Sequence, residues 1–294
     1  MSGIAESVFM CGPGRSLAGI LCEREGGEPL RPRPAAVFLN AGNVHRVGPN
    51  RLYVTLSRSL AERGFSCCRF DLSGIGDSPS RGDGRAFREY APAETRQVLD
   101  DLETRRGVKR FVLVGVCAGA DVSLDVAAED ERVAGVILVN GAFVDGGAFA
   151  EVYHRAEKRT MRRYYLKRVF SPVAWWRFFT GKSAFWKAIA DGLRSKSSRK
   201  PEARTAAKPE GTTPETKRKW SLLARRRAGA LLVFAEGSVF WDVFRGEAEP
   251  AVRDVYPPER IRVVMQKATD HTFTLLSSQN ELLETITSWL ETQF

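Results

Sequence analysis

Apolar and polar positions along this chain form blocks that predict strands separated by helices. Six runs are dominated by apolar residues: AAVFLNAG, FSCCRFDL, RFVLVGV, VAGVILVNG, GALLVFAEG and IRVVMQK. Four other segments repeat their apolar positions at helical spacing: residues 50–64, 90–106, 118–129 and 272–290. Strands that are apolar throughout are buried on both faces, so the pattern predicts an α/β fold with a mostly parallel sheet between helices. The segment ESVFMCGPGRSLAGILCERE adds two short strands around a Gly-Pro-Gly turn, which predicts a hairpin at one edge.

This alternation stops between Asn140 and Ala230, for about ninety residues, which is too long for an ordinary connection. The first half of the stretch interleaves aromatic and basic residues, whereas residues 194–219 are polar and carry almost no large apolar groups. We therefore expect one core built from residues 1–144 and 228–294, with residues 145–227 inserted as a cap and the tract 194–219 mobile.

Length and cysteine content narrow the class of protein. A chain of 294 residues can bury one large core, and it contains neither a signal-peptide pattern nor an apolar run long enough to cross a membrane. We therefore expect a cytoplasmic protein without a transmembrane segment. The five cysteines are odd in number and include no Cys-x-x-Cys pair, so we expect no structural disulfide, metal or cofactor.

The stretch FVLVGVCAGADVSL, residues 111–124, begins as a buried strand, turns between two glycines and continues as an amphipathic helix. Its centre, GVCAG, matches the strand-turn-helix elbow that presents a catalytic nucleophile, normally serine, at the end of a parallel sheet. A thiol at this place lies near the positive end of the helix dipole, which lowers its pKa from about 8.5 and favours the thiolate. Cys117 is therefore the candidate nucleophile. The alternative is an elbow that has lost catalysis, where the cysteine is only a small packing residue.

Such a nucleophile needs a base, an acid that orients the base, and donors for an oxyanion. Of the three histidines, His271 is preferred as the base because it lies between the last predicted strand and the final helix. Asp242 is the preferred acid, since it follows the strand GALLVFAEG in a predicted loop, and Glu236 at the strand end is the alternative. Asp270, beside the histidine, is expected to form a turn. The order nucleophile, acid, base is the one expected for this kind of elbow.

The rest of the predicted site consists of backbone donors and substrate contacts. One oxyanion donor is expected from the Ala118 N–H, directly after the nucleophile, and the second from Ala41 or Gly42 in the first loop. The residues expected to touch substrate are Asn43 and His45 in that loop and Trp175 and Trp176 in the cap. The alternative for the cap's aromatic residues is that they form its own core. The loop DLSGIGDS, residues 71–78, is interpreted as structural.

Together these features resemble the α/β-hydrolase superfamily, over nearly the whole chain outside the insertion. The resemblance rests on the elbow, on DLSGIGDS, which resembles the family's D-x-x-G-x-G-x-S, and on the late acid and histidine. The stretches VHRVGPNRLYVTLSRSLAERGF and RFDLSGIGDS further resemble bacterial hydrolases encoded beside exopolysaccharide or exosortase systems. Those relatives carry serine at the position of Cys117, and many family members carry aspartate near Ser238.

The cysteine decides which activity the resemblance implies. Dienelactone hydrolases and polyhydroxyalkanoate synthases use cysteine on this fold, the latter to hold an acyl chain as a thioester. We therefore expect an acyltransferase or (thio)esterase with a Cys-His-Asp triad, which takes an acyl group from an ester or thioester and releases it to an acceptor or to water. The alternatives are a noncatalytic binding protein that keeps the fold, and a peripheral protein that uses its basic cap.

The distribution of charge along the chain indicates which kind of acyl donor to expect. The chain carries a net charge of +10, yet residues 151–227 hold 22 lysines and arginines against 6 acidic residues. This segment is either a solvated, self-repelling surface or a region that attracts an anionic partner. Because no nucleic-acid-binding motif accompanies it, the expected partner is a coenzyme A thioester or an acidic acyl-carrier protein.

Overall fold

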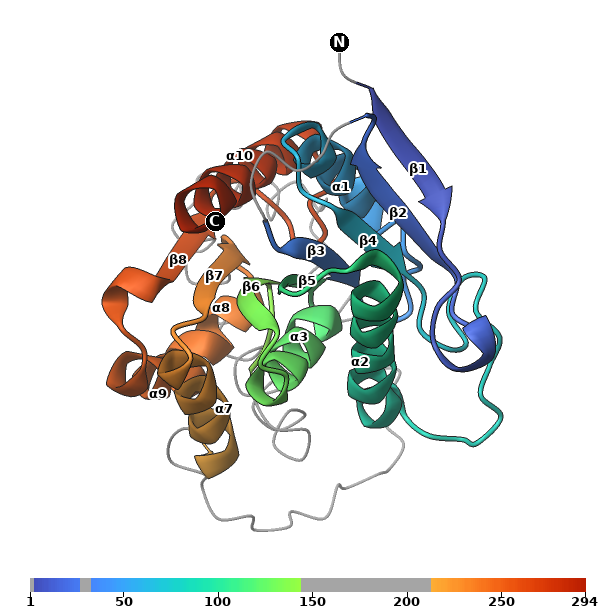
Figure 1. Cartoon of the computed structure of the whole chain (residues 1–294). Helices are drawn as coiled ribbons and strands as arrows, with labels where there is room; N and C mark the ends of the chain where they lie inside the picture. The colour runs from blue at the N-terminus through green and yellow to red at the C-terminus, as the bar shows by residue number, and fades with distance from the viewer. Residues whose placement is uncertain (1–2, 27–32, 144–212) are drawn as a thin grey trace, which may run out of the picture. The chain divides into compact units, whose positions relative to one another are not determined.

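The computed structural model describes residues 3–26, 33–143 and 213–294, all of which belong to one compact unit (Figure 1). Its strands are β1 (Ile4–Val8), β2 (Gly19–Arg24), β3 (Ala35–Leu39), β4 (Cys67–Phe70), β5 (Phe111–Val116), β6 (Val133–Val139), β7 (Gly229–Ala235) and β8 (Ile261–Gln266). Its α-helices are α1 (Leu52–Glu62), α2 (Phe87–Arg106), α3 (Ala118–Glu129), α7 (Pro214–Arg225), α8 (Val239–Val243), α9 (Glu249–Val255) and α10 (Leu276–Gln293).

All these strands join one sheet in the order β1-β2-β4-β3-β5-β6-β7-β8. The pairs β1–β2 and β2–β4 are antiparallel, and every pair from β4 to β8 is parallel. Strands β3, β5 and β7 are buried along their whole length, as continuous apolar runs predict, and β4 is buried too although it contains Arg69. The predicted fold class and the hairpin edge are therefore confirmed.

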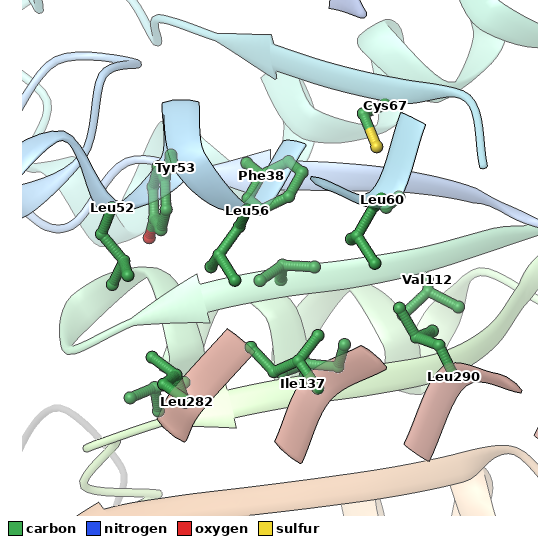
Figure 2. Close-up of a cluster of buried hydrophobic side chains, with 14 of the residues drawn as sticks. Phe38, Leu52, Tyr53, Leu56, Leu60, Cys67, Val112, Ile137, Leu282 and Leu290 are labelled. Atoms are coloured by element: carbon green, nitrogen blue, oxygen red, sulfur yellow. The ribbon is translucent and has the colours of Figure 1, made fainter. Parts of the chain in front are cut away.

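Helices cover both faces of the sheet, with α1 and α10 on one face and α2, α3 and α7 on the other (Figure 1). Figure 2 shows the main cluster of buried side chains, which lies between the sheet and the pair α1 and α10. Its members include Leu52, Leu56 and Leu60 of α1, Leu282, Ile286 and Leu290 of α10, and Phe38, Val112 and Ile137 of the sheet. Burying one such side chain contributes about 1.5–3 kcal/mol, so this cluster holds the strands, and hence their carboxyl ends, in fixed register.

Helices α1 and α2 span Leu52–Glu62 and Phe87–Arg106 where the sequence predicted residues 50–64 and 90–106, and two larger differences lie near the candidate acid and base. The final helix begins at Leu276 rather than Thr272, because the Asp270 carboxylate accepts the Thr274 N–H (2.8 Å) and closes a turn first. Residues 239–243, predicted to be loop, form the short helix α8, whose Ser238 hydroxyl caps it by accepting the Phe240 N–H (3.3 Å).

Helix α7 lies at the end of the segment predicted as the cap. Thr213 caps it, and Trp220 near its middle is fully buried. Residues 214–219, the last part of the tract predicted to be mobile, are therefore helical. Residues 144–212 lie outside the described residues, so the domain boundaries remain a prediction. Among the helices of the described residues, none has both the length and the apolar character of a membrane span.

Candidate active site

Cys117 lies at the apex of the turn between β5 and α3, with φ 56° and ψ −122°. A positive φ in a side-chain-bearing residue costs about 1–3 kcal/mol and persists only where the surroundings enforce it. They do so through two glycines: a Cβ on Gly115 would lie 2.2 Å from the Gly119 carbonyl oxygen, and one on Gly119 would lie 2.6 Å from the Asn40 carbonyl oxygen. Strand and helix thus approach so closely that only glycine fits, and the predicted elbow is present.

The Cys117 thiol is mostly buried, and burial raises its pKa. The Ala118 amide, which hydrogen-bonds to the sulfur, acts in the opposite direction, Asp121 raises the pKa further, and Arg88 lowers it. The sequence-based expectation of a lowered pKa is therefore wrong, because it counted the helix end and not the burial. At neutral pH the thiol is protonated, so a base must remove its proton before it can attack.

His271 lies in the loop between β8 and α10, and side-chain amides hold this loop from two sides. Asn140, which follows β6, donates through Nδ2 to the His271 carbonyl oxygen (3.0 Å). Asn50, in the turn before α1, donates to the next carbonyl of the loop (3.1 Å). The Cys117 N–H in turn donates to the carbonyl oxygen of Val139, the neighbour of Asn140 (2.9 Å). The backbones of His271, which follows β8, and of Cys117, which follows β5, are thus both hydrogen-bonded to residues at the carboxyl end of β6.

The His271 ring is partly buried and stacks on Phe240 of α8, with centroids 4.9 Å apart and planes at 18°. Burial lowers its pKa below the ordinary value of 6.5, against the opposing charge of Asp270. The ring is therefore neutral at pH 7, as a proton acceptor must be. Its Nδ1 is buried and has no hydrogen-bond partner among the described residues. In a catalytic triad, the orienting acid is hydrogen-bonded to this nitrogen.

The two candidate acids lie in α8 and directly after β7. Asp242 is in α8, two residues after Phe240, rather than in the predicted loop. Glu236 directly follows β7, and its carboxylate accepts the Ala268 N–H (3.3 Å) at the start of the histidine loop. The Nδ1 of His271 has no hydrogen-bond partner among the described residues, so no contact of this nitrogen distinguishes the two acids. The choice of Asp242 over Glu236 therefore stays a prediction.

The first loop, residues 40–48, is shaped by a buried polar network. Asn40, at the end of β3, donates through Nδ2 to the Val44 carbonyl oxygen (3.0 Å) and to Asp71 Oδ1 (3.2 Å). Asp71 begins the DLSGIGDS loop and also forms an ion pair with Arg46. The structural interpretation of DLSGIGDS is thus confirmed: it ties down the loop that contains Gly42, which has φ 60° and open space beside it.

The predicted substrate contacts are only partly described. Asn43 and His45 are exposed on the first loop, and Trp175 and Trp176 lie outside the described residues. Ala41 and Cys117 pack against one hydrophobic cluster that also contains Phe273, two residues after His271. The structure therefore brings the elbow, the first loop and the histidine loop to the same edge of the sheet, while the roles of their residues remain predictions.

One charged residue near the elbow was not indicated by the sequence pattern. Asp121, in the first turn of α3, is only 6 % exposed. Its carboxylate accepts the N–H groups of Ala142 (3.0 Å) and Phe143 (2.8 Å) and pairs with Arg88 (2.6 Å). Burial raises the pKa of Asp121 to about 6, although Arg88 opposes the shift. An acidic residue between apolar positions of a buried helix was the only available signal.

A mostly parallel sheet with a nucleophile elbow at its carboxyl edge defines the α/β-hydrolase class. Residues 35–209 match the family model described as serine aminopeptidase, S33, and the chain belongs to this hydrolase family. The matched range includes Cys117. A search of curated protein sequences found no match.

Solved structures with the same fold cover almost the whole chain. The chain is similar to a dienelactone hydrolase from Anabaena variabilis, with 13% identity, 98% of each chain covered and a TM-score of 0.59. It is similar to proline iminopeptidase from Mycobacterium smegmatis, with 14% identity, 98% of each chain covered and a TM-score of 0.56. For mouse alpha/beta hydrolase domain-containing protein 10 the identity is 17%, the coverage 99% of this chain and 100% of the mouse chain, and the TM-score 0.53. At such identities the likeness shows the fold, and the resemblance to exosortase-associated hydrolases stays a prediction.

Proposed function

We propose that the protein is an acyl-transferring enzyme in which Cys117 takes an acyl group from an ester or thioester, holds it as a thioester and releases it to an acceptor nucleophile or to water. The observation that carries this proposal is the Cys117 backbone, held at φ 56° at the apex of the elbow with its thiol only partly accessible. Packing alone does not require a strained residue there, whereas presentation of a nucleophile does.

In the proposed reaction, His271 accepts the thiol proton as the sulfur attacks the carbonyl carbon. The new C–S bond forms while the carbonyl π electrons move to oxygen, and the resulting oxyanion is bound by the Ala118 N–H and by the N–H of Ala41 or Gly42. The oxyanion then collapses, and the leaving group departs with the proton that His271 returns. An acceptor, activated by the same imidazole, releases the acyl group in the reverse order.

The acid would complete this machinery through the buried Nδ1 of His271. We assign Asp242 to this role, with Glu236 as the alternative, because α8 also supplies the ring that stacks on the imidazole. A carboxylate at Nδ1 would fix the tautomer in which Nε2 accepts the proton.

The proposal extends to the donor and the cap. A thioester intermediate keeps more acyl-transfer potential than an oxyester, so transfer competes with hydrolysis when water is excluded. The proposed cap consists of residues 145–227, and the residues proposed to contact substrate are Trp175 and Trp176 of this segment and Asn43 and His45 of the first loop. The basic residues of this segment support a coenzyme A or carrier-protein thioester as donor.

The direct test is the covalent adduct. Wild-type protein incubated with p-nitrophenyl acetate or acetyl-coenzyme A should gain one acetyl group by intact-protein mass spectrometry, and Cys117→Ala should gain none. Cys11→Ala is the matched control, because Cys11 is a fully buried free thiol outside the site. An adduct that persists in Cys117→Ala would contradict the proposal, and no adduct in the wild type would favour the noncatalytic alternative.

A second variant separates transfer from hydrolysis. In Cys117→Ser the intermediate becomes an oxyester, which keeps less transfer potential, so transfer to an added amine or alcohol should fall while hydrolysis survives. Equal loss of both activities would indicate that the cysteine is structural.

A further inference from the structure

The hydroxyl of Tyr53 fills a gap between two strand ends beside the candidate nucleophile. Tyr53 is the second residue of α1, is 0 % exposed, and its ring lies tilted against Phe38 with centroids 5.3 Å apart (Figure 2). Its hydroxyl donates to the Leu39 carbonyl oxygen (2.8 Å) and accepts the Val116 N–H (3.0 Å). Leu39 is the last residue of β3, and Val116 is the last residue of β5.

This hydroxyl takes the place of a ladder hydrogen bond. The parallel pairing of β3 and β5 ends where Leu39 lies opposite Gly115. One residue further, the Val116 N–H and the Leu39 carbonyl would be the next donor and acceptor to meet. The phenol oxygen lies between them and bonds to both. The two strands are therefore held apart at this level by the width of a hydroxyl group, and both backbone groups stay satisfied.

Each of these strand ends leads to one proposed oxyanion donor. Ala118 comes two residues after Val116, and Ala41 comes two residues after Leu39. An oxyanion needs its donors about 2.7–3.1 Å away, so the separation of the strand ends bears directly on catalysis. We propose that Tyr53 is a positioning residue whose hydroxyl acts as a spacer that sets the distance between the two oxyanion donors. This inference rests on the proposed function.

The surroundings fix the ring and keep the hydroxyl neutral. A Cβ on Gly48, which has φ 76°, would lie 2.6 Å from the Tyr53 Cγ, so the first loop packs directly on the ring. The Tyr53 N–H also donates to the Val47 carbonyl oxygen (3.1 Å) of the same loop. Burial raises the pKa of the phenol above its ordinary value of 10.0; the Val116 hydrogen bond opposes this and Cys117 adds to it. A neutral hydroxyl can both donate and accept, as a spacer between a carbonyl and an amide must.

Tyr53→Phe tests the spacer because it removes one oxygen atom and keeps the ring. Without that atom the strand ends can close on each other, and the donors lose their alignment. We expect kcat for p-nitrophenyl acetate to fall about 10- to 100-fold with KM nearly unchanged, since misalignment acts on the transition state. Alkylation of Cys117 by iodoacetamide should keep its rate, because displacement at a saturated carbon forms no oxyanion.

Tyr256→Phe is the matched control. Its hydroxyl is also buried and donates to a backbone carbonyl, that of Ala228. Ala228 lies at the amino end of β7, whereas the candidate site lies at the carboxyl ends of the strands. Both rates should match the wild type. Gly48→Ala is the second variant, because it displaces the ring while keeping the hydroxyl, and it should reproduce the loss of kcat.

Three results would overturn the spacer. The first is a kcat of Tyr53→Phe within about twofold of wild type, normalised to the thiol titrated by iodoacetamide. The second is a parallel loss of alkylation and acylation in both Tyr53→Phe and Gly48→Ala, since that indicates a damaged elbow rather than misaligned donors. The third is a wild-type protein that forms no acyl-enzyme on Cys117, which would refute the proposed function itself and the spacer with it.

Discussion

Replacing Asp121 by asparagine is expected to change how the free energy of unfolding depends on pH. Burial raises the pKa of this carboxyl from 3.8 to about 6 in the folded protein, with Arg88 opposing the shift. Between these values the folded protein binds a proton that the unfolded chain does not. The carboxyl therefore stabilises the fold fully below about pH 4, and this contribution is lost as the pH rises through about 6.

The magnitude follows from the size of the shift. About two pKa units at 1.36 kcal/mol per unit correspond to about 3 kcal/mol of stability lost between pH 4 and pH 7. Asparagine does not titrate, and its Oδ1 can still accept the N–H groups of Ala142 and Phe143 that Oδ1 of Asp121 accepts. Only the ion pair with Arg88 is removed, and that side chain, 34% exposed, can be hydrated instead.

Urea unfolding followed by circular dichroism at several pH values measures the effect. Other groups titrate alike in both proteins, so the difference between wild type and Asp121→Asn isolates this carboxyl. The wild type should lose about 3 kcal/mol relative to the variant from pH 4 to pH 7. Asp125→Asn, one turn later in α3 and paired with Lys219 (2.8 Å), should keep most of the wild-type slope, because burial of Asp121 is the largest cause of its raised pKa and the charge of Asp125 is a smaller one. Parallel curves for wild type and Asp121→Asn would show that the Arg88 pair outweighs burial.

Four further outcomes are expected. Asp242→Asn should lower kcat by at least about tenfold while Glu236→Gln leaves it unchanged, and the opposite result in steady-state assays would move the triad acid to Glu236. Asn140→Ala should lower kcat and should lower the free energy of unfolding by about 1–3 kcal/mol, because the His271 carbonyl and the buried Ala235 N–H lose their hydrogen-bond partner. Unchanged kinetics would exclude a role of Asn140 in holding the His271 loop. The acid limb of kcat/KM should have its midpoint below pH 6.5, because burial lowers the pKa of His271, and a midpoint above pH 7 would contradict its role as the base. Rates with acetyl-coenzyme A should fall as salt rises while rates with a neutral ester do not, and coincident salt profiles would refute steering by the basic segment.

The sheet and the elbow could be predicted because their physical causes lie within short stretches of sequence. A strand buried on both faces must be apolar at every position, and β3, β5 and β7 are. The elbow requires glycine where strand and helix touch, so Gly115 and Gly119 mark it without any knowledge of the rest of the fold.

Features that depend on distant contacts were not predictable in the same way. The buried Asp121 carboxylate pairs with Arg88, 33 residues earlier, and accepts the N–H groups of Ala142 and Phe143, about 20 residues later. No local sequence pattern connects these residues to it. The sign of the Cys117 pKa shift was missed for a related reason, since the helix end is local and burial is not. Helix α8 has only five residues, too few for an apolar period to show.

The pairing of β6 with β7 determines when, during synthesis, the site can become complete. Val136 pairs with Ala230, which comes 94 positions later in the chain, so the sheet is continued only after the whole segment between the two strands has been synthesised. Cys117 leaves the ribosome before this interval and His271 after it. Closing so long a loop is entropically costly and slows folding. A nascent chain thus carries its thiol well before it acquires the imidazole that can deprotonate it. Recovery of activity after dilution from urea should accordingly lag behind the formation of β3, β5 and β6, so that catalysis reports the last stage of folding rather than the first.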